Sequence, residues 1–314
     1  MDDHNILIFN PKYNHLNKFN KKIDGTNFNN KLNASYLITK KEEIDFENYD
    51  FVYHIFLMCF TQFNKILNFN KEKQFIHLYP GGGLSYLDNI FLVDPATNVI
   101  STHHRTTKKL IEIGHKNFIN VYMGPLMKKS ETFVNKLEKK DDESVSICFS
   151  SLGDPNDKGN DTFEKLVKHY INFPEKKIKF HTVGNFKSQE NVTTHPPMDY
   201  LSLGKFYQEN IDIYINSETG KFYNGWPLGL ESVISGSVLI TTDPNNDHDH
   251  YFKQNSGIFI FKDFRQLIEI IEFLYENKKT LHLYSKISQK NFSKFLTYEN
   301  QQKKIFEYIK NKLN

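Results

Sequence analysis

Residues 211–261, IDIYINSETGKFYNGWPLGLESVISGSVLITTDPNNDHDHYFKQNSGIFIF, decide the fold of the chain. The continuous apolar run Ile211–Asn216 is typical of a buried strand, and a polar turn and a glycine- and proline-bearing loop follow it. We predict a short helix at Leu230–Ser235, ended by Gly236, and a second strand at Val238–Asp243. Strand, loop, helix and strand make a βαβ unit with parallel strands, whose loop leaves the carboxyl end of the first strand. Open α/β sheets bind their ligands at that end.

One carboxylate falls close to this predicted ligand position. Glu231 lies in the first turn of the predicted helix. Backbone N–H groups at a helix N-terminus face anions such as phosphates, and a carboxylate beside them accepts hydrogen bonds from ribose hydroxyls. The arrangement therefore indicates a nucleotide site. The simpler alternative is an exposed carboxylate that the helix dipole stabilises.

The remainder of the chain alternates between predicted strands and helices. Strands are predicted at 6–9, 34–38, 51–57, 74–79, 98–101, 118–122, 145–149, 178–184 and 256–261, and helices at 106–113, at 162–170, after Asp263 and at 298–313. Two successive alternating sets predict an α/β protein with two tandem doubly wound, Rossmann-like domains. The predicted parts are an N-terminal domain at 1–127, a charged linker at 128–144, a C-terminal domain at 145–295 and a terminal helix within 296–314.

The composition excludes several classes of protein. The 314 residues carry a net charge of +3 without a basic arm, so we expect no nucleic-acid partner. Hydrophobic residues make up 39%, the mean hydropathy is −0.57, and no apolar run is long enough to span a bilayer. Cys59 and Cys148 lie in apolar runs, which favours buried, reduced thiols and a cytoplasmic protein. Met1–His4 leads directly into a predicted strand, so we expect no signal peptide.

Three segments, in this order and spacing, resemble one enzyme family. They are Asn98–Pro125 (strand, Ser, helix, Gly, strand), Ser150–Gly159 (a loop that ends in Lys-Gly) and Ile211–Phe261. Together they resemble the retaining nucleotide-sugar glycosyltransferases of group 1, also called family 4, which have the GT-B fold. The resemblance covers about residues 98–275. It implies two Rossmann-like domains that face each other across a cleft, with the terminal helix packing back across them.

The resemblance also implies an activity. It indicates a hexosyltransferase-type enzyme of polysaccharide biosynthesis that takes a sugar from a nucleotide-diphosphate sugar, with UDP or GDP as the nucleotide. The acceptor would be a glycan, a lipid-linked molecule or a protein, and transfer would retain the anomeric configuration. Enzymes with this fold generally work without an essential metal ion, so we expect no cofactor and no metal site. A partner glycosyltransferase is also considered.

Several residues fall on positions that bind the donor in the family. Lys158 falls on the lysine that contacts the donor diphosphate, where a compact positive charge stabilises the leaving group. Glu231 falls on the second glutamate of the Glu-x7-Glu motif, which binds the ribose. The loop that would approach the phosphates comprises Gly225, Trp226, Pro227, Leu228 and Gly229, with Trp226 walling the pocket. The alternatives are a solvated loop lysine at position 158 and a plain tight turn at 225–229.

The sequence departs from the family pattern at three places. Tyr223 stands where the first glutamate of the motif is expected, and we consider Glu218 as the residue that supplies this carboxylate for catalysis. Ser151 stands where the family has an arginine, which removes one diphosphate contact but leaves Ser151 in the predicted nucleotide site. Pro244–Asn245 replaces the usual pair of glycines. These changes affect the sugar-binding half of the prediction more than the nucleotide-binding half.

The candidate site residues in the first predicted domain have weaker support from the sequence. His77 ends a predicted strand near the place where the family often has a histidine over the donor sugar, and its alternative is a core histidine. Gly81–Gly83 follows it, either as a phosphate-approaching loop or as a turn. His103–Arg105 at a helix start would contact phosphate or acceptor, or simply face solvent.

Two further patterns have simple explanations. Asp247–His250 alternates aspartate and histidine, but adjacent residues on an extended segment point to opposite faces and rarely complete a metal shell. We therefore predict no metal site there. The basic tail around Lys303–Lys312 would give peripheral contact with the inner face of a membrane, or instead pack against the domains.

Two other functions remain open at this point. The first is a nucleotide-sugar epimerase or hydrolase with the GT-B fold, although no clear carboxylate pair supports its chemistry. The second is a catalytically silent GT-B protein that acts as partner or scaffold for an active transferase. Tyr223, Ser151 and the replacement of the glycine pair by Pro244–Asn245 favour this second alternative.

Overall fold

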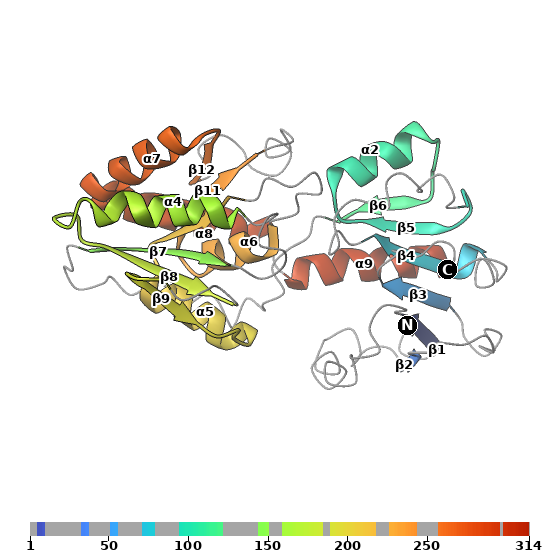
Figure 1. The fold of residues 1–314 in the computed structure, drawn as a ribbon. Helices are drawn as coiled ribbons and strands as arrows, with labels where there is room; N and C mark the ends of the chain where they lie inside the picture. Colours follow the sequence, from blue (N-terminus) through green and yellow to red (C-terminus); the bar gives the residue numbers. More distant parts are fainter. Residues whose placement is uncertain are drawn as a thin grey trace. The chain divides into compact units, whose positions relative to one another are not determined.

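The computed structural model describes residues 5–9, 33–37, 51–55, 71–78, 94–121, 144–150, 159–184, 189–217, 226–243, 257–295 and 298–313. The chain divides into two compact units (Figure 1). The first comprises Met1–Met123 together with Gln301–Asn314, and the second comprises Gly124–Asn300. Each unit contains one six-stranded sheet in which every described strand pair is parallel.

The first unit has the strand order β2-β1-β3-β4-β5-β6. Its strands are β1 (Asn5–Phe9), β2 (Asn33–Leu37), β3 (Phe51–Ile55), β4 (Gln74–Leu78), β5 (Asn98–Ser101) and β6 (Phe118–Asn120). Its described helices are the 3-10 turn η5 (Lys71–Lys73), α2 (His104–Glu112) and most of α9 (Tyr298–Leu313). The order places β1 and β3 side by side although β2 lies between them in sequence, which is the doubly wound arrangement.

Alternation along β5 explains how α9 and α2 cover the first sheet. Ile100 packs with Ile305 and Ile309 of α9 in one buried cluster. The hydroxyl of Ser101 lies 2.9 Å from that of Thr107 on α2. Because successive side chains of a strand point to opposite faces, the two helices lie on opposite sides of this sheet.

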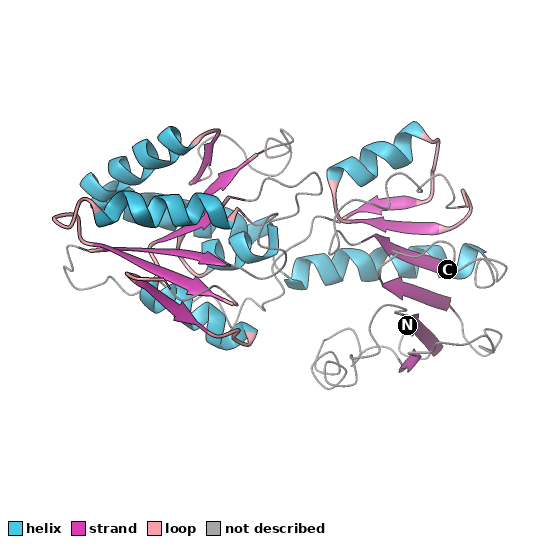
Figure 2. Cartoon of the chain, viewed as in Figure 1, coloured by secondary structure: helices cyan, strands magenta, loops and turns pink. Residues whose placement is uncertain are grey.

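The second unit has the strand order β12-β11-β10-β7-β8-β9. Its strands are β7 (Val145–Ser150), β8 (Ile178–Val183), β9 (Val192–His195), β10 (Ile213–Asn216), β11 (Val238–Thr242) and β12 (Ile258–Phe261). Its helices are α4 (Asn160–Ile171), α5 (Tyr200–Asn210), α6 (Trp226–Ile234), α7 (Phe264–Glu276) and α8 (Lys278–Phe295). Figure 2 shows helices on both faces of this sheet.

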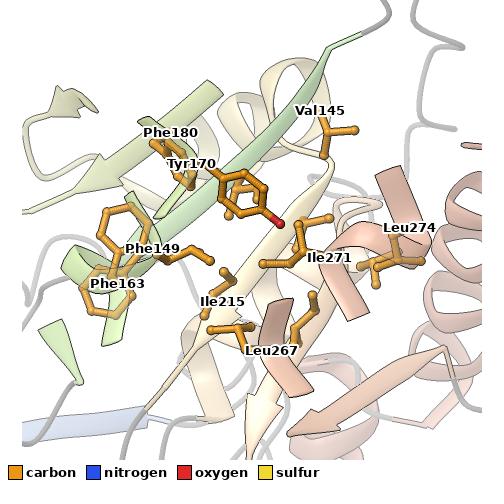
Figure 3. Close-up of a cluster of buried hydrophobic side chains, with 14 of the residues drawn as sticks. Val145, Phe149, Phe163, Tyr170, Phe180, Ile215, Leu267, Ile271 and Leu274 are labelled. Carbon is orange, nitrogen blue, oxygen red and sulfur yellow. The ribbon is translucent and has the colours of Figure 1, made fainter. Parts of the chain in front are cut away.

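Alternate residues of the strands form the main core of the second unit (Figure 3). Val145, Ile147 and Phe149 of β7 pack against α4 and α7 in one buried cluster, and Phe149 stacks on Phe163 with ring centroids 4.9 Å apart. The intervening residue Cys148 therefore faces the opposite side, where α5 packs. Both faces of the sheet are buried, which explains the continuous apolar runs of its strands.

These two doubly wound units confirm the predicted α/β fold class. The Asp263-capped helix and the terminal helix 298–313 are also confirmed, since Asp263 accepts from the backbone N–H of Gln266 at the start of α7. The prediction missed β9, α5 and α8 altogether. The strand predicted to begin at Ile211 begins two residues later in the structure, at Ile213. The reason is that the N–H of Ile211 caps α5 by donating to the carbonyl of Tyr207.

The helix predicted at Leu230–Ser235 begins earlier in the structure. α6 starts at Trp226, so Trp226–Gly229 are helical rather than part of a loop. Pro227 is compatible with this because a proline in the first helical turn lacks only an N–H that has no partner within the helix. The predicted linker 128–144 lies outside the described residues, except for Ser144. Among the helices that the structure describes, none is long and apolar enough to cross a membrane.

Candidate functional site

The strand order of the second sheet creates a switch point between β7 and β10. From β7 the chain passes to β8 and β9, and α5 then returns it to β10 on the other side of β7. In open α/β sheets the ligand crevice lies outside the carboxyl ends of the two strands at such a point. Here those ends are Ser150 and Asn216, and the candidate site is built around them.

The helix α4 begins beside this switch point. Its N-cap is Gly159, which has a left-handed backbone (φ 74°) and has no side chain with which to cap the helix. The first N–H groups of an α-helix have no partner within it, and the helix dipole places partial positive charge there. The 12-residue α4 therefore presents a start that suits an anion.

Ser217 joins the end of β10 to the start of α4. Its hydroxyl donates to the carbonyl of Gly159 at 2.9 Å, and Ser217 is fully buried. A Cβ added at Gly159 would overlap the carbonyl and the hydroxyl of Ser217, so only glycine fits this close approach. Gly159, at the start of α4, is thus held directly against the end of β10.

Polar side chains also form hydrogen bonds at the ends of the neighbouring strands, along the carboxyl edge of the sheet. Asn216 Nδ2 donates to Thr241 Oγ1 at 3.2 Å, which joins β10 to β11. Thr241 Oγ1 in turn donates to the carbonyl of Thr242 at 3.1 Å. On the other side of β7, the hydroxyl of Ser150 donates to the carbonyl of Val183 at 3.4 Å. The strand ends are therefore fixed before their loops begin.

Glu231 lies on α6, the helix that follows β10. It is the sixth residue of α6 and so falls in the second turn, not the first as predicted, because the helix starts at Trp226. Its side chain is only 1% exposed, which rules out the alternative of a solvent-exposed carboxylate. A carboxylate is rarely buried without polar or charged contacts.

Glu231 lies near the buried phenol of Tyr207, which also interacts with a second tyrosine and a thiol. Burial raises the pKa of the Tyr207 phenol well above its usual value, and nearby Tyr214, Cys148 and Glu231 raise this pKa further. The Tyr207 and Tyr214 rings meet edge to face with centroids 5.6 Å apart. Burial also raises the pKa of the Cys148 thiol, which keeps it protonated. The prediction that Cys148 is a buried thiol is confirmed, and Cys59 lies outside the described residues.

The helix α8 holds the carboxyl end of α6. Gln289 Nε2 donates to the carbonyl of Ile234 at 2.8 Å, and the Ser285 hydroxyl donates to the carbonyl of Gly236 at 2.5 Å. These carbonyls lack partners within a helix that ends there. α8 therefore fixes the helix that carries Glu231.

Several predicted site residues lie outside the described part of the chain. They are Ser151, Lys158, Glu218, Gly225 and, among the departures from the family pattern, Tyr223. Trp226, Pro227 and Leu228 form the first turn of α6 rather than a loop, which corrects the predicted conformation of this segment. Their side chains are not described. The structure adds Gly159, Asn216, Ser217 and Thr241 to the candidate site, and the only signal for them in the sequence is their position at strand ends and at the start of a helix.

His77 lies in the first unit and is largely enclosed. It is the fourth residue of β4 and is 9% exposed, with Nδ1 2.8 Å from the hydroxyl of Tyr53 on β3. Burial lowers the pKa of His77 to about 4. The imidazole is therefore neutral at physiological pH and suits hydrogen bonding rather than proton donation.

The second histidine candidate in the first unit has a structural role. His103 is the N-cap of α2, is 1% exposed, and accepts from the backbone N–H of Arg105 through Nδ1 at 3.2 Å. Gly81–Gly83 and Asp247–His250 lie outside the described residues. Within the part of the chain that the structure describes, no group of three or more His, Cys, Asp or Glu residues is arranged to hold a metal ion.

Comparison with solved structures identifies the architecture. HepE of Anabaena, solved with UDP-glucose, aligns with a TM-score of 0.72 over 98% of this chain and 100% of that chain, at 12% sequence identity. A glycosyltransferase from Rickettsia africae aligns with a TM-score of 0.71 over 100% of both chains, at 11% identity. Sucrose-phosphate synthase from Thermosynechococcus elongatus aligns with a TM-score of 0.71 over 98% of both chains, at 11% identity.

The chain has the GT-B fold. No protein-family model matches the sequence, and no curated protein matches it. The GT-B alignments span both units, including the residues before Asn98, which the sequence resemblance did not cover. The GT-B fold predicted from three short segments is therefore confirmed over the length of the chain.

Proposed function

We propose that the chain is a glycosyltransferase that binds a nucleotide-diphosphate sugar at the carboxyl edge of the second sheet. The observation that carries this proposal is the switch point, where the start of α4, the end of β10 and the helix bearing buried Glu231 follow one another around a single sheet edge. The fold agrees with it, since HepE of the same architecture was solved with UDP-glucose.

Each part of the proposed site has a chemical task. The start of α4 and the preceding Lys158 bind the diphosphate, whose negative charge grows as the glycosyl bond breaks. Glu231 accepts hydrogen bonds from the ribose hydroxyls, because a buried carboxylate makes strong bonds to such donors. Ser151 and the start of α6 at Trp226–Leu228 complete the nucleotide site, while Glu218 contacts the sugar.

The rate acceleration would come from positioning and charge stabilisation. A diphosphate leaves easily when fixed positive charge and N–H dipoles already face it, since they need no reorganisation during the reaction. Orientation of the donor sugar against the acceptor converts a bimolecular step into one within the complex. We propose retention at the anomeric carbon, a glycan, lipid-linked or protein acceptor, and activity that requires no metal ion.

The proposal is tested by a thermal-shift screen against UDP, GDP, ADP, CDP, dTDP and their common sugars, followed by donor hydrolysis without acceptor. A ligand at about a hundred times its Kd stabilises the protein by roughly 2.7 kcal/mol, which raises Tm measurably. We expect a shift with one base and slow release of free sugar. The absence of any shift would contradict the proposal.

The second candidate is a silent GT-B partner protein. Tyr223 and Ser151, which replace family residues of the donor site, favour it. It predicts a nucleotide-induced shift without hydrolysis or transfer, or no shift at all. Donor hydrolysis therefore separates the two candidates.

A further inference from the structure

The first carbonyl of α4 receives an unusual set of donors. The carbonyl of Gly159 accepts from the N–H groups of Thr162 and Phe163 within the helix, at 3.0 and 3.3 Å. It also accepts from the hydroxyl of Ser217, at 2.9 Å, although Ser217 lies 58 positions further along the chain. One hydroxyl at the end of β10 is thus bonded to the residue at which α4 begins.

The contact leaves little freedom to either partner. Ser217 is fully buried, Gly159 is buried with its backbone in the left-handed region, and a Cβ at Gly159 would overlap Ser217. Movement of the start of α4 away from β10 would break a buried hydrogen bond, and movement towards β10 would cause a steric clash. The distance between the start of α4 and the end of β10 can therefore neither increase nor decrease freely.

We propose that Ser217 is a positioning residue for the donor diphosphate. Its hydroxyl fixes the first turn of α4, and with it the direction of the N–H groups there, relative to the end of β10. This inference rests on the proposed function, because it concerns the site at which the nucleotide diphosphate would bind. In this proposal Ser217 does not itself contact the substrate.

The physical reason is preorganisation. N–H dipoles that already point at the phosphate position stabilise its charge without a reorganisation cost, whereas a loosened helix start must be ordered when the ligand binds. Loss of the hydroxyl should therefore weaken the binding of a diphosphate more than the binding of a nucleoside, which does not reach the helix start.

The chain offers a matched control in Ser237. Its hydroxyl donates to the carbonyl of Ile211 at 3.1 Å, and both residues are fully buried. Ser237 precedes β11 and Ile211 precedes β10, so this bond lies at the amino edge of the same sheet, away from the proposed site. Ser217→Ala and Ser237→Ala each remove one buried hydroxyl-to-carbonyl bond and should lower stability similarly.

The experiment is calorimetric titration of wild type and the two variants with UDP and with uridine. If the wild type prefers another base, the corresponding diphosphate and nucleoside are used. We expect Ser217→Ala to weaken diphosphate binding about tenfold, a typical effect of one hydrogen bond. Nucleoside binding should change by less than about twofold, and Ser237→Ala should change neither affinity by more than this. Equal losses for diphosphate and nucleoside, or equal losses in the two variants, would overturn the inference.

A second variant tests the same contact from its other partner. Gly159→Ala places a Cβ against Ser217 and should also weaken diphosphate binding selectively. Because both changes disrupt one contact, the double variant should bind the diphosphate no more weakly than Gly159→Ala alone. Additive losses would contradict a shared role. A wild-type chain that binds no nucleotide would remove the proposed function and this inference together, whereas normal wild-type binding with an unchanged diphosphate-to-nucleoside ratio in Ser217→Ala would remove the inference alone.

Discussion

The hydroxyl of Tyr53 lies 2.8 Å from Nδ1 of His77, and the pair joins the neighbouring strands β3 and β4 inside the first unit. Their rings meet edge to face with centroids 5.9 Å apart. Burial lowers the pKa of His77 to about 4, below the value of about 6.5 expected in an unfolded chain. The folded state therefore binds a proton at His77 less readily than the unfolded state does.

This difference predicts a loss of stability in acid. The contribution of neutral His77 is fully present above pH 6.5 and is lost as the pH falls from 6.5 towards 4. Between pH 7.5 and 5.0 it should reduce the free energy of unfolding of the first unit by roughly 2 kcal/mol. Urea unfolding at both pH values should show this loss in the wild type and a correspondingly smaller loss in His77→Gln. A His77 ring resonance that titrates near pH 6.5 in the folded protein would contradict the prediction.

Lys158 is predicted to bind the diphosphate through its charge. Lys158→Ala should weaken UDP binding by more than tenfold and leave uridine binding almost unchanged, because only the diphosphate loses a partner. The control is Lys168→Ala, which removes an exposed lysine from the last turn of the same helix α4. Calorimetry with both ligands measures the two affinities. Equal effects of the two alanine variants would exclude Lys158 from the site.

Glu231 is predicted to bind the ribose hydroxyls. Glu231→Gln keeps the size of the side chain but removes its charge, and hydrogen bonds to charged groups contribute about 1.5–3 kcal/mol each. UDP affinity should therefore fall at least tenfold. The wild type should prefer UDP strongly over 2′,3′-dideoxy-UDP, and the variant should discriminate less.

The control for this variant is Glu269→Gln on α7, where the carboxylate pairs with Arg265 and is 58% exposed. It should leave both affinities unchanged. Undiminished discrimination in Glu231→Gln would show that another residue binds the ribose.

Metal removal should leave the activity intact. The proposed chemistry stabilises the departing diphosphate by N–H dipoles and Lys158, so it requires no divalent cation. Donor hydrolysis should proceed at the same rate after dialysis against EDTA and after addition of excess Mg²⁺ or Mn²⁺. Loss of hydrolysis in EDTA, restored by either ion, would show that the reaction needs a metal.

The strands were predictable from the sequence because strands of a sheet buried on both faces are continuous apolar runs. The missed helix α8 shows where this signal fails. Its buried stripe is Leu281, Ser285, Ser288 and Phe292, at helical spacing but with serines at half of the positions. These serines bind backbone carbonyls and allow close helix packing, so the stripe has little apolar content. The prediction missed the four-residue edge strand β9 for a related reason, since none of its residues is fully buried.

The candidate site was predictable only in part. Glu231 could be proposed as a site residue from its helix and its place in a βαβ unit. The prediction put it in the first turn of that helix instead of the second, because Pro227 is tolerated at the helix start and the helix begins earlier. Ser217 was not predictable as a partner of Gly159, because no periodicity relates residues 58 positions apart in different crossovers. Such contacts depend on the strand order, which places β10 beside β7.

The central claim is that a nucleotide diphosphate binds at the carboxyl edge of the second sheet, and hydrogen exchange with and without saturating UDP tests it most directly. If the wild type prefers another base, the corresponding diphosphate replaces UDP. We predict that the ligand slows exchange at the backbone amides of 159–163, where α4 begins, and in α6 around Glu231. Unchanged exchange at both places, in a protein shown to bind the ligand, would contradict the account.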